Sequence, residues 1–145
     1  MKIIATDADI QEGLAFLQAV DHRLAPLVAA AGPVPLRRHA PGFEGLCAII
    51  VSQQLSVASA NAIWLKTKTF LSPCATATIA AADEPALRAC GLSGPKIRTL
   101  RSMAEAALDG RQRLDELAAM TPDEAQAHLT AVRGIGPWTA EIYRM

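Results

Sequence analysis

Aromatic residues are scarce in this sequence, and it carries no excess of charge of either sign. Phe, Trp and Tyr make up 4% of the 145 residues and β-branched runs are short, which disfavours an extensive β-sheet core. The formal net charge is zero, so the chain has no overall polybasic character and any anion-binding site must be local. About half of the residues are hydrophobic, and many of these are alanine, the strongest helix former. These features favour one all-α domain, or parts of two small ones.

Cysteine, histidine and long apolar runs are also limited, and each limit excludes a class of site. Cys47, Cys74 and Cys90 form no CxxC pair, so neither a zinc site nor a disulfide framework is indicated, and free thiols are expected. The three histidines are scattered and form no HExxH motif. No signal peptide begins the chain, and no apolar run approaches the ~20 residues of a membrane span. We therefore expect a cytoplasmic protein with no membrane association.

The spacing of apolar residues predicts an all-α fold of about eight short helices joined by tight turns. The first helix is expected over 7–20 with Asp7 or Asp9 as its cap, after a segment 1–6 that suits a short strand or an extended lead-in. Ser93 is expected to cap a longer helix that follows it. Further helices are expected over 25–31, 43–53, 57–71, 84–90, 94–109, 114–120, 122–132 and from 137 onward, with a helical turn over 78–82. The stretch "GPVPLRRHAPG" (32–42) is rich in proline and glycine and indicates a connection between subdomains.

A glycine turn near the C-terminus joins two of these helices. Gly134 can take a positive φ, Ile135 is placed to pack beneath the turn, and Gly136 lets another backbone approach without a Cβ in the way. The next helix begins at Pro137 with free N–H groups directed outward, and such groups bind phosphate. The alternative is an ordinary αα-hairpin with a glycine turn.

The wider pattern, with an apolar residue before the first glycine, then G-I-G and T-A, resembles the helix-hairpin-helix DNA-binding motif. The resemblance implies that Gly134, Ile135, Gly136, Trp138 and Thr139 contact the DNA backbone. Such contacts fix the register of a protein on DNA and carry no base information.

Two further segments indicate which family of proteins with this motif the chain resembles. "GFEGLCAIIVSQQLSVASANAI" (42–63) and "GLSGPKIRTLRSMAEAALDG" (91–110) resemble helix-hairpin-helix DNA glycosylases, most closely the DNA-3-methyladenine glycosylase II group. The resemblance covers roughly residues 40–145. It implies an N-terminal helical segment and linker over 1–40 and a glycosylase domain over 41–145.

The first of these segments contains Gln53 and Gln54 in a loop between two helices. The resemblance implies that this loop carries a wedge, a side chain that inserts into the DNA duplex. In the family, a side chain from this loop fills the hole left when a damaged nucleotide rotates out of the duplex. By position Gln54 is the wedge, with Leu55 as the second candidate because an apolar side chain stacks well. The alternative is that Gln53 and Gln54 only cap the end of the preceding helix.

Trp138 stands where strand-cutting members of the superfamily carry a lysine that attacks the sugar and forms a Schiff base. The resemblance therefore implies a monofunctional enzyme that uses water. An indole at this place can also form part of the base pocket and stack on an extruded, positively charged alkylated purine. The alternative is a tryptophan that belongs to the core.

The family's catalytic aspartate follows the hairpin by about two dozen residues and stabilises the charge that develops on the sugar. The chain ends at Met145, so no catalytic residue is assigned within it, and neither Asp123 nor Glu141 matches the family's position. This favours a truncated portion of a longer glycosylase, inactive alone, over a natural DNA-binding module without chemistry.

The expected activity is base-excision repair: hydrolysis of the N-glycosidic bond of alkylated purines such as 3-methyladenine in double-stranded DNA. A monomer is expected at full length. No cofactor is expected, apart from a monovalent cation at the backbone of Arg133, Gly134 and Gly136, which relatives bind at the hairpin.

Overall fold

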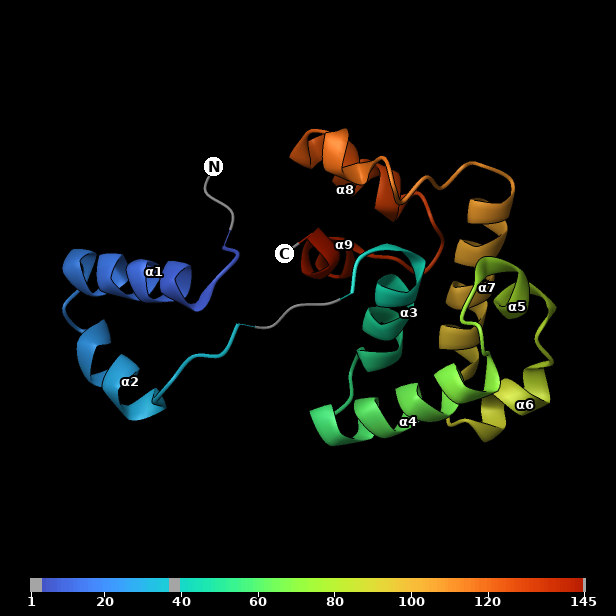
Figure 1. The fold of residues 1–145 in the computed structure, drawn as a ribbon, viewed down its shortest axis with the longest axis horizontal. Helices are drawn as coiled ribbons and strands as arrows, with labels where there is room; N and C mark the ends of the chain where they lie inside the picture. Colours follow the sequence, from blue (N-terminus) through green and yellow to red (C-terminus); the bar gives the residue numbers. More distant parts are fainter. Residues whose placement is uncertain (1–3, 37–39, 145) are drawn as a thin grey trace. The chain divides into compact units, whose positions relative to one another are not determined.

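The computed structural model describes residues 4–36 and 40–144, and every regular element within those ranges is helical (Figure 1). The fold class predicted from the sequence is therefore confirmed. The helices are α1 (Asp7–Val20), α2 (Leu24–Ala31), α3 (Gly42–Ser52), α4 (Val57–Phe70), α5 (Thr76–Ala81), α6 (Glu84–Ala89), α7 (Gly94–Leu108), the short 3-10 helix η1 (Leu117–Ala119), α8 (Pro122–Thr130) and α9 (Pro137–Arg144).

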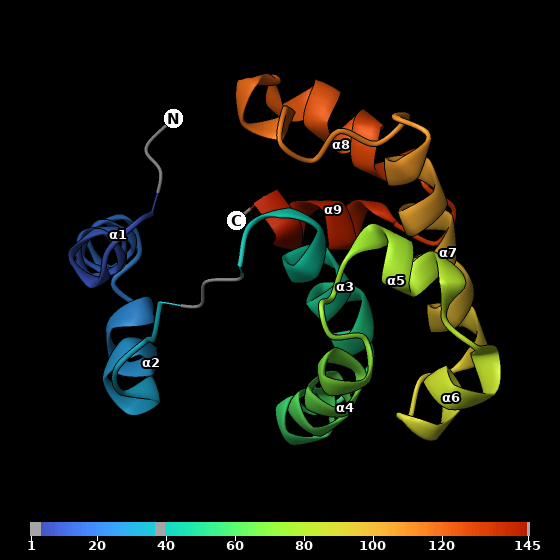
Figure 2. The ribbon, with the colours of Figure 1, turned by 45° about the vertical axis from the view of Figure 1, so that its right-hand side comes forward.

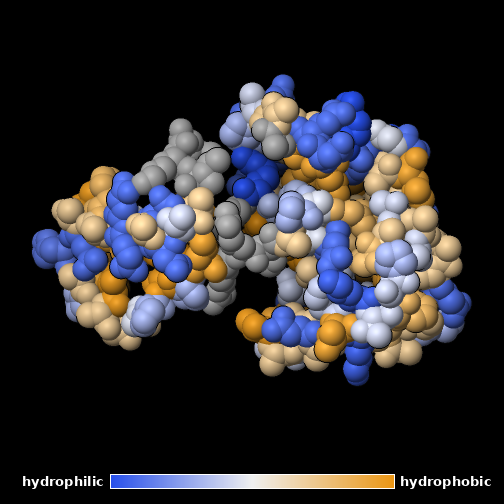
Figure 3. Space-filling model, viewed as in Figure 1, coloured by the Kyte–Doolittle hydropathy of each residue, from blue (hydrophilic) through white to orange (hydrophobic). Residues whose placement is uncertain are grey.

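The N-terminal unit consists of α1 and α2, which pack on each other. The cap of α1 is Thr6, which corrects the expectation of Asp7 or Asp9. Its hydroxyl accepts the Asp9 N–H at 3.3 Å, while the Asp9 carboxylate accepts the Thr6 N–H at 2.9 Å, a reciprocal capping box. Residues 4–6 form no strand. Neither helix buries a residue, and apolar side chains such as Phe16 stay exposed. Hydrophobic side chains, in orange, are visible on the surface of this unit in Figure 3.

The second unit, from residue 40 to Arg144, is built around α3. Six of its eleven residues are buried, because the segment is apolar on nearly every side. α3 packs against α4, α7 and α9, and α7 also packs against α5 and α6 (Figures 1 and 2). The core joins Leu46 and Ile50 of α3 to Leu100 of α7 and Ile135 of the turn before α9. The glycine turn is thus fastened to the same core as α3.

Several helix ends differ from the sequence expectation by one or two residues, and contacts explain the differences in two segments. The helical turn expected over 78–82 begins earlier, at Thr76, because the Thr78 hydroxyl accepts the Ala75 N–H at 2.9 Å and shares its own proton between the Pro73 and Ala75 carbonyls. The helix expected over 114–120 is reduced to η1. Gln112 holds the chain out of helical geometry, since its backbone N–H donates to the Ala106 carbonyl and its side-chain amide to the His128 carbonyl.

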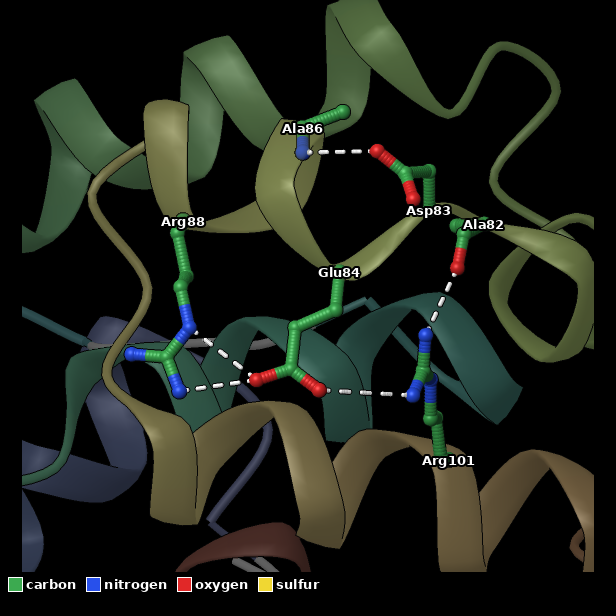
Figure 4. A network of polar contacts seen from close by, with 6 residues as sticks. All are labelled: Ala82, Asp83, Glu84, Ala86, Arg88 and Arg101. Carbon is green, nitrogen blue, oxygen red and sulfur yellow. Dashed lines mark hydrogen bonds and ion pairs between the residues drawn. The ribbon is translucent and has the colours of Figure 1, made fainter.

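The start of α6 is tied to the middle of α7 by a polar network around Glu84 (Figure 4). The Glu84 carboxylate pairs with Arg88 at 2.7 Å and faces Arg101 at 3.6 Å. Arg101 also donates to the Ala82 carbonyl at 2.8 Å, which fastens the α5–α6 connection to α7. Ser93 occupies the cap position of α7, but its hydroxyl makes no capping hydrogen bond, contrary to expectation.

Candidate nucleic-acid interface

The glycine turn between α8 and α9 has the geometry that its sequence predicts. Gly134 has a φ of 95°, and the Ile135 N–H donates to the Val132 carbonyl at 3.0 Å, which closes the turn. Ile135 is 4% exposed and packs into the core. The first intrahelical bond of α9 runs from the Ala140 N–H to the Gly136 carbonyl at 3.1 Å. The N–H groups of the first turn of α9 are therefore left for an acceptor outside the helix.

The two glycines of the turn have different reasons to be glycine. A Cβ at Gly134 would overlap the Thr99 side chain of α7, and its φ disfavours any other residue, so the fold itself requires this glycine. A Cβ at Gly136 would meet nothing within 4 Å. Within the described residues, therefore, no neighbouring atom requires a glycine at 136, and the space beside it is open to a molecule that approaches from outside.

The first turn of α9 carries one exposed and one buried side chain. Trp138 is 60% exposed, so it does not belong to the core of the described residues, and its role at DNA stays a prediction. Thr139 is 3% exposed, and its hydroxyl oxygen accepts a hydrogen bond from the Gln53 side-chain amide at 2.6 Å. The Thr139 side chain therefore faces α3, and its backbone N–H is the group that remains for a phosphate.

The Gln-Gln loop lies at the other end of that hydrogen bond. Gln53 follows Ser52, the last residue of α3, and its side chain reaches Thr139 rather than capping its own helix. Gln54 is exposed and has a φ of 57°, a left-handed conformation that non-glycine residues rarely adopt. Leu55 is 38% exposed, and Ser56 then caps α4 through the Ser59 N–H. We call residues 53–56 the wedge loop. Gln54 and Leu55 are both exposed, and the wedge role stays a prediction for each of them.

Lys96, in the first turn of α7, contacts the end of α3 that leads into the wedge loop. Its Nζ donates to the Val51 carbonyl in the last turn of α3 at 2.6 Å, where a positive charge also suits the helix dipole. Partial burial lowers the pKa of Lys96 from its ordinary value of 10.5. The sequence alone does not predict this contact, because Val51 lies 45 residues away from Lys96.

Asp123 and Glu141, the two acids weighed above for a catalytic role, have structural explanations. Asp123 lies in the first turn of α8, where a carboxylate favours the helix start. Glu141 pairs with Arg144 at 2.9 Å. At the far end of α9, the Tyr143 hydroxyl accepts the Gly42 N–H at 2.9 Å, which ties the helix to the start of α3.

The backbone carbonyls of Arg133, Gly134 and Gly136 are the expected ligands of the monovalent cation. Among the backbone bonds of the described residues, none ends on the Arg133 or Gly134 carbonyl, whereas the Gly136 carbonyl already accepts the Ala140 N–H. Two of the three predicted oxygens are thus unoccupied by backbone donors. Across 4–36 and 40–144, His, Cys, Asp and Glu side chains form no group of three suited to a metal ion. None of the described helices has the length and apolarity needed to cross a membrane.

Comparison with known proteins identifies the family. The family model of the HhH-GPD superfamily base excision DNA repair proteins matches residues 47–135, from α3 through the glycine turn. The alkylbase DNA glycosidase-like protein mag2 of Schizosaccharomyces pombe is 30% identical over 97% of this chain and 69% of its own length. The chain therefore belongs to the HhH-GPD superfamily, as its sequence motifs predict.

Other relatives are longer than this chain. DNA-3-methyladenine glycosylase 1 of the same yeast is 34% identical, over 83% of this chain and 54% of its own length. A crystal structure of a DNA-3-methyladenine glycosidase from Bacillus halodurans superposes with a TM-score of 0.71 at 33% identity, covering 88% of this chain and 60% of that one. The S. pombe 3-methyladenine DNA glycosylase in complex with abasic DNA gives a TM-score of 0.80 at 31% identity, covering 90% and 67%. The chain thus spans between about half and two thirds of these relatives.

Proposed function

We propose that this protein is a monofunctional DNA glycosylase that removes alkylated purines such as 3-methyladenine from double-stranded DNA. Within it, residues 40–144 provide the DNA grip and the wedge. The observation that carries the proposal is the first turn of α9, which presents free N–H groups and an exposed Trp138 beside a glycine that the fold does not need. The relatives whose names include alkylbase or 3-methyladenine glycosylase support the substrate class.

In this proposal the protein binds DNA through backbone N–H groups of the first turn of α9. The N–H groups of Trp138 and Thr139 lie at the positive end of α9, where the peptide dipoles and unpaired donors together attract a phosphate. Gly136 lets the phosphodiester approach closely, since a Cβ there would point into open space. These contacts would hold the duplex in one register without reading its sequence.

The wedge and the tryptophan would act on the damaged nucleotide. Extruding a base costs a few kcal/mol, and a side chain inserted into the gap offsets part of the lost stacking. Gln54 and Leu55 are exposed and are the candidates for insertion. The exposed indole of Trp138 can stack on a cationic alkylated purine. Because Trp138 has no amine, the sugar would be attacked by water and not by a protein nucleophile.

A monovalent cation is the second part of the proposal. The Arg133 and Gly134 carbonyls are free of backbone donors and are hard oxygen ligands, so they suit such an ion. A bound cation would neutralise some of the phosphate charge at the turn. Exchanging K⁺ for the bulky tetramethylammonium ion at constant ionic strength should then weaken DNA binding. Equal affinity in the two salts would remove the cation from the account.

DNA binding by the 145-residue chain is the first test. A fluorescently labelled duplex that carries a tetrahydrofuran abasic-site analogue should bind with an affinity that falls linearly on a plot of log K against log salt concentration. An intact duplex of the same sequence should bind more weakly. No binding at low salt would contradict the proposed function.

Base release is the second test. Methylated duplex DNA is incubated with the chain, and with the chain extended by any sequence its gene encodes after Met145, and free 3-methyladenine is measured by chromatography. Release without strand breaks supports a monofunctional glycosylase. DNA binding without release from either protein would favour the alternative, a DNA-backbone-binding module without chemistry. A product trapped by borohydride would contradict the monofunctional mechanism.

A further inference from the structure

We propose that Gln53 is a positioning residue that couples the DNA grip to the wedge. Through its hydrogen bond to Thr139, phosphate binding at the first turn of α9 sets the position of Gln54 and Leu55. The inference rests on the proposed DNA-binding function and adds to it a mechanical link between two parts of the site.

The link consists of one hydrogen bond between the side chains of Gln53 and Thr139. The Gln53 Nε2 lies 2.6 Å from the Thr139 Oγ1, although 86 residues separate them in the sequence. Thr139 is 3% exposed and Gln53 is half-buried, so water competes poorly for this bond. Among the described residues, the backbone N–H of the same threonine has no backbone acceptor. One residue therefore contacts the phosphate with its main chain and the wedge loop with its side chain.

The wedge loop is held so that a displacement at Gln53 reaches Gln54. The Gln53 N–H donates to the Ile50 carbonyl at 3.4 Å, and the Leu55 N–H donates to the Ser52 carbonyl at 3.2 Å. Gln54 between them has a φ of 57°. A non-glycine residue stays in this conformation only when its surroundings enforce it. The amide of Gln53 is the contact by which α9 takes part in that enforcement.

The structure offers no competing reason for a glutamine at 53. Its side chain does not cap α3, whose last carbonyls are served by Lys96 and by backbone N–H groups of the loop. A methionine has the same length and would keep the packing while removing the donor. Gln53 is therefore separable from the two exposed wedge candidates by substitution.

The test compares Gln53→Met with the unaltered chain. The probes are two labelled duplexes of one sequence, one intact and one with a tetrahydrofuran abasic-site analogue, each with 2-aminopurine beside the variable position. We expect Gln53→Met to bind the intact duplex as tightly as the unaltered chain. The preference for the abasic duplex should fall roughly 2- to 10-fold, the range that one lost hydrogen bond predicts. The rise in 2-aminopurine fluorescence on binding should fall with it, because the wedge no longer unstacks its neighbour.

A second set of variants keeps the test independent of Gln53→Met folding. Thr139→Val removes the acceptor and should lower the same preference, whereas Thr139→Ser keeps the hydroxyl and should preserve it. The double variant Gln53→Met with Thr139→Val should lose no more than either single variant, since both remove one bond. Gln126→Met on α8 is the matched control and should change nothing. Equal thermal midpoints establish that each variant is folded.

The outcomes separate the link from the function on which it rests. An unchanged preference and fluorescence in Gln53→Met, additive losses in the double variant, or a parallel drop in affinity for both duplexes would each overturn the coupling while leaving DNA binding intact. If the unaltered chain bound neither duplex, the proposed function would fail and the coupling with it.

Discussion

The Nζ of Lys96 lies 2.6 Å from the carbonyl oxygen of Val51, so the first turn of α7 caps the last turn of α3. This contact places a positive charge beneath the wedge loop and satisfies a carbonyl that the helix itself cannot. Together with the Gln53–Thr139 bond, it holds the wedge loop between α7 and α9.

Replacing Lys96 by methionine should lower the free energy of unfolding by about 1–3 kcal/mol, because the buried Val51 carbonyl loses a charged donor. Urea-induced unfolding followed by circular dichroism measures the change. Lys66→Met on the exposed face of α4 is the control and should stay within about 0.5 kcal/mol of the unaltered chain. Equal stability of the two variants would show that the Lys96 contact contributes nothing.

Substitutions of Gly134 and Gly136 should separate a requirement for folding from a requirement for DNA binding. Gly134→Ala should cost about 2 kcal/mol or more, since it combines a φ of 95° with an overlap on Thr99. Gly136→Ala should leave the stability within about 0.5 kcal/mol, because its Cβ meets nothing within 4 Å. Urea midpoints of the two variants provide the comparison. A loss at Gly136 as large as that at Gly134 would refute the distinction.

Trp138 should matter for DNA and little for stability. In a Trp64→Phe background Trp138 is the sole tryptophan, and titration with the abasic duplex should quench its emission. Trp138→Ala should keep the unfolding midpoint while losing about 1 kcal/mol or more of binding free energy, the usual worth of one stacked base. Emission that does not respond to saturating DNA would place Trp138 outside the interface.

Tyr143 is the single tyrosine, so its titration can be followed by absorbance at 295 nm. Burial raises the pKa of Tyr143 above its ordinary value of 10.0, so the folded chain retains the proton longer than the unfolded chain. Its stabilising effect is therefore complete below pH 10 and is lost as the pH rises from 10 through the higher folded pKa. The folded chain should titrate above pH 10 and the urea-unfolded chain near 10. Identical midpoints would contradict this.

Much of the site could be predicted because its signals are local in sequence. The positive φ of Gly134 and the burial of Ile135 follow from the spacing of G-I-G between two helices. The break after Gln53 and the cap at Ser56 follow from an apolar run that ends before a serine. These features depend on neighbouring residues alone.

The contacts that assemble the site could not be predicted from one sequence. The partners of Gln53 and Lys96 lie 86 and 45 residues away, and no local pattern specifies which buried groups meet across helices. The same reason explains the error at η1, where Gln112 bonds to the distant His128 carbonyl and overrides the local helical spacing. The buried position of the Thr139 side chain likewise follows from packing against α3.

The central claim is that the first turn of α9 grips DNA through its backbone, and Gly136→Asp tests it most directly. An aspartate there adds a carboxylate where a phosphate would approach, and Gly13→Asp adds the same charge on α1, where a Cβ also meets nothing within 4 Å. Fluorescence polarisation with the abasic duplex at one fixed salt concentration compares the two variants. We predict that Gly136→Asp binds at least about tenfold more weakly than Gly13→Asp, because like charges brought together repel. Equal affinities of the two folded variants would contradict the account.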